Sequence, residues 1–138
     1  MDARRVITLL ALGAIALTAC KGDSSGPSGQ NVAGTYLYSF MNVNGCSAHL
    51  HMPITQSGTN FSGTYAGYIH CGADSAYVTG SVVQGQVHAD SVWFYLDSSN
   101  WVDVAAIQGT TWNGTFNANL VYYGSPITIA GDFTAVKQ

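Results

Sequence analysis

Apolar and polar residues alternate along the chain from residue 31 onward, in short segments separated by turn residues. Such alternation is typical of a β-strand with one buried face, because successive side chains of a strand point to opposite faces. In the clearest segment, Trp112, Gly114, Phe116, Ala118, Leu120 and Tyr122 alternate with Asn113, Thr115, Asn117 and Asn119. The whole pattern predicts eight strands, at about residues 32–41, 46–57, 60–71, 76–84, 91–97, 101–108, 112–122 and 127–136.

The second and third predicted strands form a hairpin about the turn Gly58-Thr59. Glycine at the first turn position suits a type II′ turn. Counting outward gives the pairs Gln56 with Phe61, Ile54 with Gly63, Met52 with Tyr65, Leu50 with Gly67, Ala48 with Ile69 and Cys46 with Cys71. The cysteines then form a non-hydrogen-bonded pair, the type with the closer side chains. This register predicts a disulfide between Cys46 and Cys71 on the apolar face of the hairpin.

A second hairpin is predicted where part of this sequence recurs. The segment from Gln56 to Tyr65 is nearly repeated, with one residue fewer, from Gln108 to Phe116. A turn at Gly109-Thr110 places Ile107 opposite Trp112, Ala105 opposite Gly114 and Asp103 opposite Phe116, all on the inward face.

Asp103 is therefore a candidate polar group in a ligand cavity. A buried carboxylate needs polar partners, or its pKa rises. A bulge or a slip of one residue would instead turn Asp103 to solvent, because such a slip reverses the whole face of a strand. We favour this second interpretation, and no other carboxylate has a spacing to Asp103 that predicts a hydrolytic pair.

The composition indicates an all-β domain. The chain has no Glu, few Lys and Leu, and many Gly, Thr, Ser, Val and Tyr residues, which disfavours helices. Eight antiparallel strands joined by local turns can close into an up-and-down β-barrel, whose interior holds side chains or one small ligand. A two-sheet β-sandwich is the alternative. Inward glycines beside aromatic residues, such as Gly114 between Trp112 and Phe116, favour the barrel.

The first residues predict export. Arg4 and Arg5 precede an apolar run, residues 6–19, that is too short to span a bilayer comfortably. The run ends in Leu17-Thr18-Ala19-Cys20, which resembles the lipobox of bacterial lipoproteins. The resemblance implies cleavage after residue 19 and an acylated Cys20 that anchors the protein in the cell envelope, at the outer membrane if the cell has one. A plain secretory signal is the alternative.

The predicted organisation is a signal peptide at residues 1–19, a lipidated cysteine with a Gly/Ser/Pro tether at 20–30, and a barrel domain at 31–138. With Cys20 acylated, Cys46 and Cys71 remain as one pair in an oxidising compartment. After residue 19, six Asp residues face only Lys21 and Lys137. This charge excludes nucleic acids and anionic membrane surfaces as electrostatic partners, so the bilayer is expected as a partner only through the acyl chains.

Five segments in order resemble the avidin and streptavidin family: Gly34-Thr35-Tyr36, Phe61-Ser62-Gly63-Thr64-Tyr65, Tyr77-Val78-Thr79-Gly80, Thr110-Thr111-Trp112-Asn113-Gly114 and Asp132-Phe133-Thr134-Ala135-Val136-Lys137. The resemblance implies a small barrel with Tyr65 and Trp112 on a cavity wall and Thr110 near its mouth. Tyr38 and Gly67 stand where that family has biotin-binding Asn and Ser residues. We therefore transfer the architecture and not the ligand.

Two other groups of residues have the types needed for chemistry. His49, His51 and His70 share one face of the first hairpin and are weak candidates for a Zn²⁺ or Cu²⁺ site. We favour solvated surface histidines instead, because no fourth ligand is evident. Ser24 lies in a formal G-x-S-x-G match, but a nucleophile elbow needs a strand before it and a helix after it, and Ser24 lies in the tether. We predict no enzymatic activity and no cofactor.

Several inward aromatic residues are predicted either to fill the barrel or to line a pocket for a small apolar ligand. The candidates for ligand contact are Tyr36, Tyr38, Tyr65, Asp103, Trp112 and Phe116. Binding of a small apolar molecule inside the barrel is the expected function. A protein of the envelope that interacts through its outer face, with a filled barrel, is the alternative.

Overall fold

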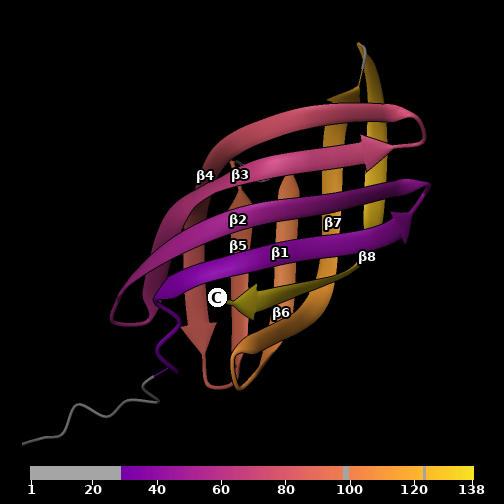
Figure 1. Cartoon of the computed structure of the whole chain (residues 1–138). Helices are drawn as coiled ribbons and strands as arrows, with labels where there is room; N and C mark the ends of the chain where they lie inside the picture. The colour runs from indigo at the N-terminus through magenta and orange to yellow at the C-terminus, as the bar shows by residue number, and fades with distance from the viewer. Residues whose placement is uncertain (1–28, 98–99, 123) are drawn as a thin grey trace, which may run out of the picture.

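The computed structural model describes residues 29–97, 100–122 and 124–138, which form one closed β-barrel (Figure 1). Its strands are β1 (Gly34–Val43), β2 (Cys46–Ser57), β3 (Asn60–Cys71), β4 (Asp74–His88), β5 (Ser91–Leu96), β6 (Trp101–Gln108), β7 (Thr111–Tyr122) and β8 (Ser125–Lys137). Each strand is antiparallel to its neighbours in the chain, and β8 pairs with β1 to close the ring. The predicted up-and-down barrel is confirmed, and the sandwich alternative is wrong.

The predicted signal peptide, Cys20, Ser24 and most of the tether lie outside the described residues. Within the part of the chain that is described, no helix is long and apolar enough to cross a membrane.

Both predicted hairpin registers are confirmed. In β2 and β3, Cys46 lies opposite Cys71 and Leu50 opposite Gly67; in β6 and β7, Asp103 lies opposite Phe116. The two Gly-Thr turns adopt the backbone that sets these registers, with φ of 62° at Gly58 and 63° at Gly109. A positive φ at the first turn position alone is the mark of a type II′ turn, whose twist matches that of the strands it joins.

The fourth strand is longer than predicted. It runs from Asp74 to His88, whereas the alternation suggested residues 76–84. A bulge between Val83 and Gln86, with Gln84 at a φ of 53°, interrupts the alternation while the pairing with β5 continues. An inserted residue changes which positions point inward, so a pattern of period two ends there although the strand does not.

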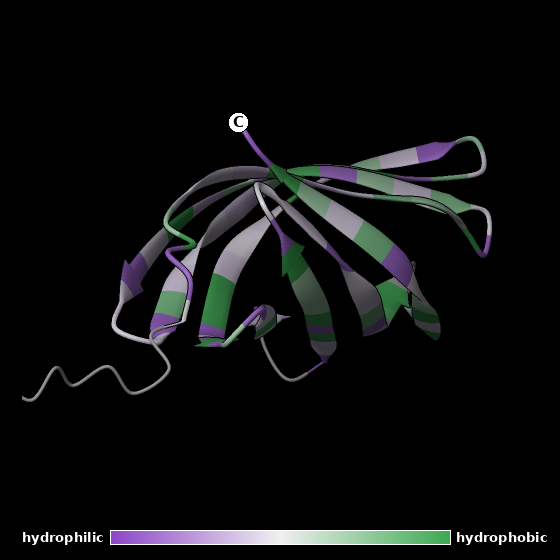
Figure 2. Ribbon diagram, turned by 90° about the horizontal axis from the view of Figure 1, so that it is seen from below, coloured by the Kyte–Doolittle hydropathy of each residue, from purple (hydrophilic) through white to green (hydrophobic). Residues whose placement is uncertain are grey.

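The core lies inside the barrel and takes one face of each strand. Green and pale or purple segments alternate along the ribbons in Figure 2, as the sequence pattern predicts. The buried face is rich in aromatic rings: Tyr36 packs on Trp112 with ring centroids 4.2 Å apart, Tyr38 stacks on Phe133 at 4.6 Å, and Phe40 stacks on Phe116 at 4.6 Å. These contacts fill the centre of the barrel with side chains.

The two ends of the barrel are built differently. The turns β2–β3, β4–β5 and β6–β7 lie toward the lower left of Figure 1, together with the start of β1. There residues 29–33 pass along the barrel end, where Val32 is buried, its N–H donates to Gln56 Oε1, and Gly29 lies against Val87. We call this the closed end. The opposite end, with the turns β1–β2, β3–β4, β5–β6 and β7–β8, is the open end.

Candidate functional site

A cavity of about 860 Å³ lies at the open end. Its inner part is buried and largely apolar, with Tyr65, Leu96, Trp101 and Ile129. Higher on its wall lie Ile69, Val78, Leu120 and Ile127, which are partly buried and pack against the core. Its rim carries polar or exposed residues, among them Asp74, Ser75, Tyr77, Asp97, Asn100, Asn119 and Val121. This volume and this mixture of an apolar wall with a few polar groups are typical of small-molecule sites, which span roughly 300–1,000 Å³.

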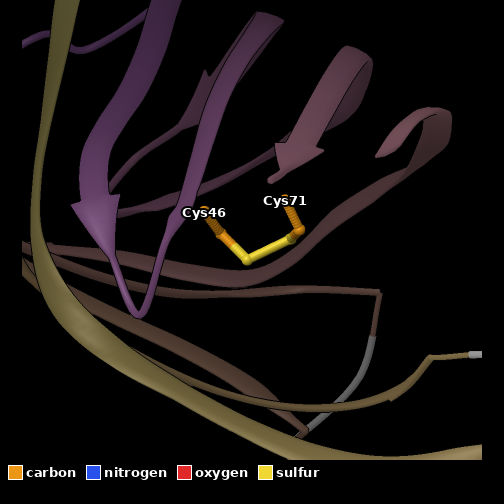
Figure 3. Close-up of a disulfide and its surroundings, with 2 residues drawn as sticks. All are labelled: Cys46 and Cys71. Atoms are coloured by element: carbon orange, nitrogen blue, oxygen red, sulfur yellow. A yellow bond between two sulfur atoms is a disulfide. The ribbon is translucent and has the colours of Figure 1, made fainter. Parts of the chain in front are cut away.

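The disulfide belongs to the same end of the barrel. Cys46 and Cys71 are bonded, with a Cα–Cα distance of 4.1 Å, which confirms the predicted pair. Figure 3 shows the bond joining the start of β2 to the end of β3, beside the β1–β2 turn. Cys71 also lines the cavity, so the bond holds two adjacent strands together in the cavity wall.

A carboxylate is fixed beside the cavity by two hydrogen bonds. Asp97 directly follows β5, and its Oδ2 accepts the hydroxyl proton of Tyr65 while its Oδ1 accepts the Ser81 N–H at 2.8 Å. The backbone N–H of Asp97 donates to the Ser81 carbonyl at 2.7 Å. Burial, and then the bond to Asp97, raises the pKa of Tyr65 well above its usual value. The Tyr65 hydroxyl therefore stays protonated at physiological pH and donates its one proton to Asp97.

A second polar group lies below the cavity, in the middle of the barrel. Asp103 is fully buried, and its Oδ1 accepts the Tyr38 hydroxyl proton at 2.8 Å. Burial raises the pKa of Asp103 well above its usual value, although the Tyr38 and Trp101 donors act in the opposite direction. Trp101 Nε1 thus lies near enough to favour the charged carboxylate, but within the described residues neither Trp101 Nε1 nor Asp103 Oδ2 makes a hydrogen bond of ordinary geometry. The interpretation that Asp103 faces solvent is wrong, because no bulge interrupts the pairing of β6 with β7.

Only one of the six predicted ligand-contact residues lines the cavity, and it is Tyr65. The other five are core residues. Tyr36 and Trp112 pack together near the closed end. Tyr38 stacks on Phe133, and Phe116 stacks on Phe40. Asp103 is fully buried beneath Trp101 and does not belong to the cavity wall. Of the residues that the avidin-like resemblance assigns to a cavity, Trp112 packs on Tyr36 and Thr110 lies in the β6–β7 turn at the closed end, so neither lines the cavity at the open end.

The three histidines that were weak candidates for a metal site do not form one in the described part of the chain. His49 lies opposite Tyr68 and His70 opposite Ser47, so the histidines do share the outer face of the hairpin as expected. All three are exposed. In the parts of the chain that the structure covers, however, no three His, Cys, Asp or Glu side chains are grouped so as to hold a metal ion. The spacing along the hairpin spreads the rings over its surface instead of directing them at one point.

Several residues of the site were not assigned from the sequence. Asp97 was expected to end a strand, and nothing in the alternation indicates that its side chain reaches Tyr65, which is 32 residues away in the sequence. Trp101, Leu120 and Ile127 were placed on strands but not assigned to a cavity. One signal was available on β8, where the inward residues change from Phe133 to Ile129 and Ile127 toward the β7–β8 turn.

Comparisons of the chain with protein-family models, with curated proteins and with solved structures found no match.

Proposed function

We propose that this protein is an exported lipoprotein, anchored through an acylated Cys20, whose barrel binds a small and largely apolar molecule at its open end without transforming it. The observation that carries the proposal is the cavity of about 860 Å³, which lies within the usual range for ligand pockets. Its apolar wall provides the driving force for binding, at about 25 cal/mol for each Å² of apolar surface removed from water. Its polar rim provides groups that orient a ligand.

The position of the cavity fits a tethered protein. The predicted tether leads into residue 29, which lies at the closed end against Val87. The cavity is at the other end of the barrel, so an anchor on Cys20 leaves its mouth facing away from the point of attachment.

Native mass spectrometry of the protein, extracted from its own cells without detergent, tests the binding. We expect a complex heavier than the processed, acylated chain, which loses a small molecule when the barrel is unfolded. An Ile127→Trp variant places a larger side chain in the apolar wall, narrows the cavity there and should retain less of that molecule. A Val104→Trp variant, on the exposed outer face of β6, adds the same side chain elsewhere and should retain it. Thermal unfolding of both variants shows whether each barrel is folded.

The anchor is tested separately. Growth with an alkyne-labelled fatty acid should label the wild type and not a Cys20→Ser variant. An unlabelled wild type would favour the plain secretory signal.

A second candidate function is supported by the outer face. Tyr68 and Tyr77 are directly paired across β3 and β4, both are exposed, and their ring centroids lie 5.1 Å apart. Exposed aromatic side chains are enriched at protein interfaces. If native mass spectrometry finds no small molecule in the wild type, an envelope protein that interacts through this face becomes the better explanation. Crosslinking through Tyr68 in living cells then identifies the protein bound there.

A further inference from the structure

The Tyr65–Asp97 pair is a built feature of the cavity wall rather than a chance surface contact. Each carboxylate oxygen of Asp97 accepts one hydrogen bond, from Tyr65 and from the Ser81 N–H. The carboxylate lies directly over Gly80, where an added Cβ would be only 2.0 Å from Oδ1. Asp97 itself has a φ of 61°, in the left-handed region that non-glycine residues seldom adopt. The chain therefore uses an unusual backbone conformation and a missing side chain to hold this carboxylate in place.

The pair determines what the Tyr65 hydroxyl can offer to a bound molecule. Its one proton is donated to Asp97, so only its oxygen lone pairs remain for other contacts. Tyr65 lines the cavity. A molecule in the cavity thus meets a hydrogen-bond acceptor at this point of the wall, backed by a carboxylate. Such an acceptor fits a donor group and repels a carboxylate.

The charges around the cavity have one sign. Asp74 and Asp97 line it, while none of the described lining residues is Lys, Arg or His. From residue 29 onward the sequence has a single Lys or Arg, Lys137, whose Nζ lies 5.9 Å from the Tyr36 ring centroid at the closed end. Two buried aromatic side chains, Tyr65 and Trp101, also line the cavity. Aromatic faces together with carboxylates are the groups that recognise organic cations.

We infer that the molecule bound in this cavity is a hydrophobic amine or other organic cation, with its positively charged or N–H donor group at the Tyr65–Asp97 pair and its apolar part against Ile69, Leu120 and Ile127. This inference rests on the proposed function and goes further by naming the class of ligand. The rigid placement of the pair supplies selectivity, because a fixed acceptor needs no reorganisation to meet a donor. A carboxylate of the same size and shape would face Asp97 across the Tyr65 hydroxyl and has no cation with which to pair.

Three adamantane derivatives of matched shape test the inference: 1-adamantylammonium, 1-adamantanol and 1-adamantanecarboxylate. The processed full chain is held in nanodiscs of zwitterionic lipid, with empty nanodiscs as the blank, and binding is measured by isothermal titration calorimetry. For the wild type we expect the ammonium compound to bind about tenfold or more tightly than the carboxylate, with the alcohol between them. Added salt should reduce the difference.

Asp97→Asn should lower the affinity for the ammonium compound to about that for the alcohol, and Tyr65→Phe should reduce it severalfold. Asp90→Asn removes an exposed carboxylate from the β4–β5 turn at the closed end and should leave all three affinities unchanged. If a variant fails to unfold cooperatively, the wild type alone still tests the inference, through its preference for the ammonium compound over the carboxylate and the decrease of that preference with added salt.

Equal binding of the three compounds, or tighter binding of the carboxylate, would overturn the inference while leaving ligand binding intact. No binding of the ammonium compound would overturn it as well. Whether the cavity holds any molecule at all is decided independently by the mass spectrum of the protein from its own cells.

Discussion

The closed and open ends of the barrel have the same strands and the same alternation but different side chains inside. At the closed end, Trp112 contacts the rings of Tyr36, Phe61 and Phe94, at centroid distances of 4.2, 5.8 and 5.8 Å. At the open end, aliphatic side chains cover the wall and leave about 860 Å³ unfilled. The interior of an eight-stranded barrel is just wide enough to be filled by side chains or to hold one small ligand. This barrel is filled at its closed end and has a cavity at its open end.

Under the proposed function, this difference separates the residues that stabilise the fold from those that contact a ligand. Aromatic packing at the closed end removes large areas from water and makes many close contacts, which stabilises the fold. The open end lacks such packing, and its strands are held together by the Cys46–Cys71 bond and by the polar contacts of Asp97. Side chains at the open end can therefore vary to suit a ligand with little loss of packing, whereas a change of side chain at the closed end disturbs its packed neighbours.

The largest effect expected from a single substitution is at the closed end. Trp112→Ala should lower the free energy of unfolding by about 3–5 kcal/mol, because it leaves a cavity among rings that cannot collapse to fill it. Leu120→Ala, in the cavity wall, is the matched change at the open end. It should cost about 1 kcal/mol, because that side chain is only partly buried. Urea unfolding measures both values, and equal losses would show that the two ends are not packed differently.

The disulfide should have the next largest effect. The bond joins residues 25 apart in the sequence, and the chain-entropy model gives a stabilisation of about 3 kcal/mol for such a loop. A Cys46→Ser/Cys71→Ser double variant should lose this amount in urea unfolding. Hydrogen exchange should increase most at the open end, where the Gly72 N–H donates to the Gly45 carbonyl at 3.2 Å.

A simpler measurement checks the bond itself. Without reductant, neither Cys46 nor Cys71 should react with an alkylating agent under denaturing conditions. Alkylated Cys46 in the mass spectrum would mean that the covalent link in the cavity wall is missing from the protein.

The sequence predicted the pairing of strands better than it predicted the site, for a physical reason. A tight turn such as Gly58-Thr59 fixes the register of its hairpin, and a period of two then assigns each residue to a face. These are local properties, so Cys46 was placed opposite Cys71 and Asp103 opposite Phe116. Alternation does not say how far along the barrel axis an inward residue lies, nor what fills the space across from it. For that reason Tyr36 and Trp112 were assigned to a ligand cavity although they pack on each other.

Asp103 shows the same limit in one residue. The hairpin register places its side chain inside the barrel, whereas the favoured interpretation was a bulge or slip that exposes it, because a slip of one residue reverses the whole face of a strand. Its partner is the Tyr38 hydroxyl, 65 residues away and on a strand that is not adjacent to β6 in the barrel. Only closure of the barrel brings these two side chains together.

Asp103 lies where the filled and the open parts of the interior meet, and its titration gives the last effect that we predict. Burial raises its pKa in the folded barrel above that in the unfolded chain, which is near 3.9. Below about pH 4 the carboxyl group is protonated in both states. As the pH rises toward the folded pKa, the unfolded chain ionises first, so unfolding becomes more favourable by about 1.4 kcal/mol for each unit of difference between the two values.

Asp103→Asn removes this titration and keeps an acceptor for the Tyr38 hydroxyl. We expect the free energy of unfolding of the wild type, relative to that of the variant, to fall between pH 4.5 and pH 8, as measured by urea unfolding at both. Asp132→Asn, which changes an exposed residue on β8, should follow the wild type. Parallel pH dependences for wild type and Asp103→Asn would mean that Asp103 is ionised inside the folded barrel. In that case the Trp101 N–H would have to help stabilise the charge, which would extend the polar region from the cavity into the centre of the barrel.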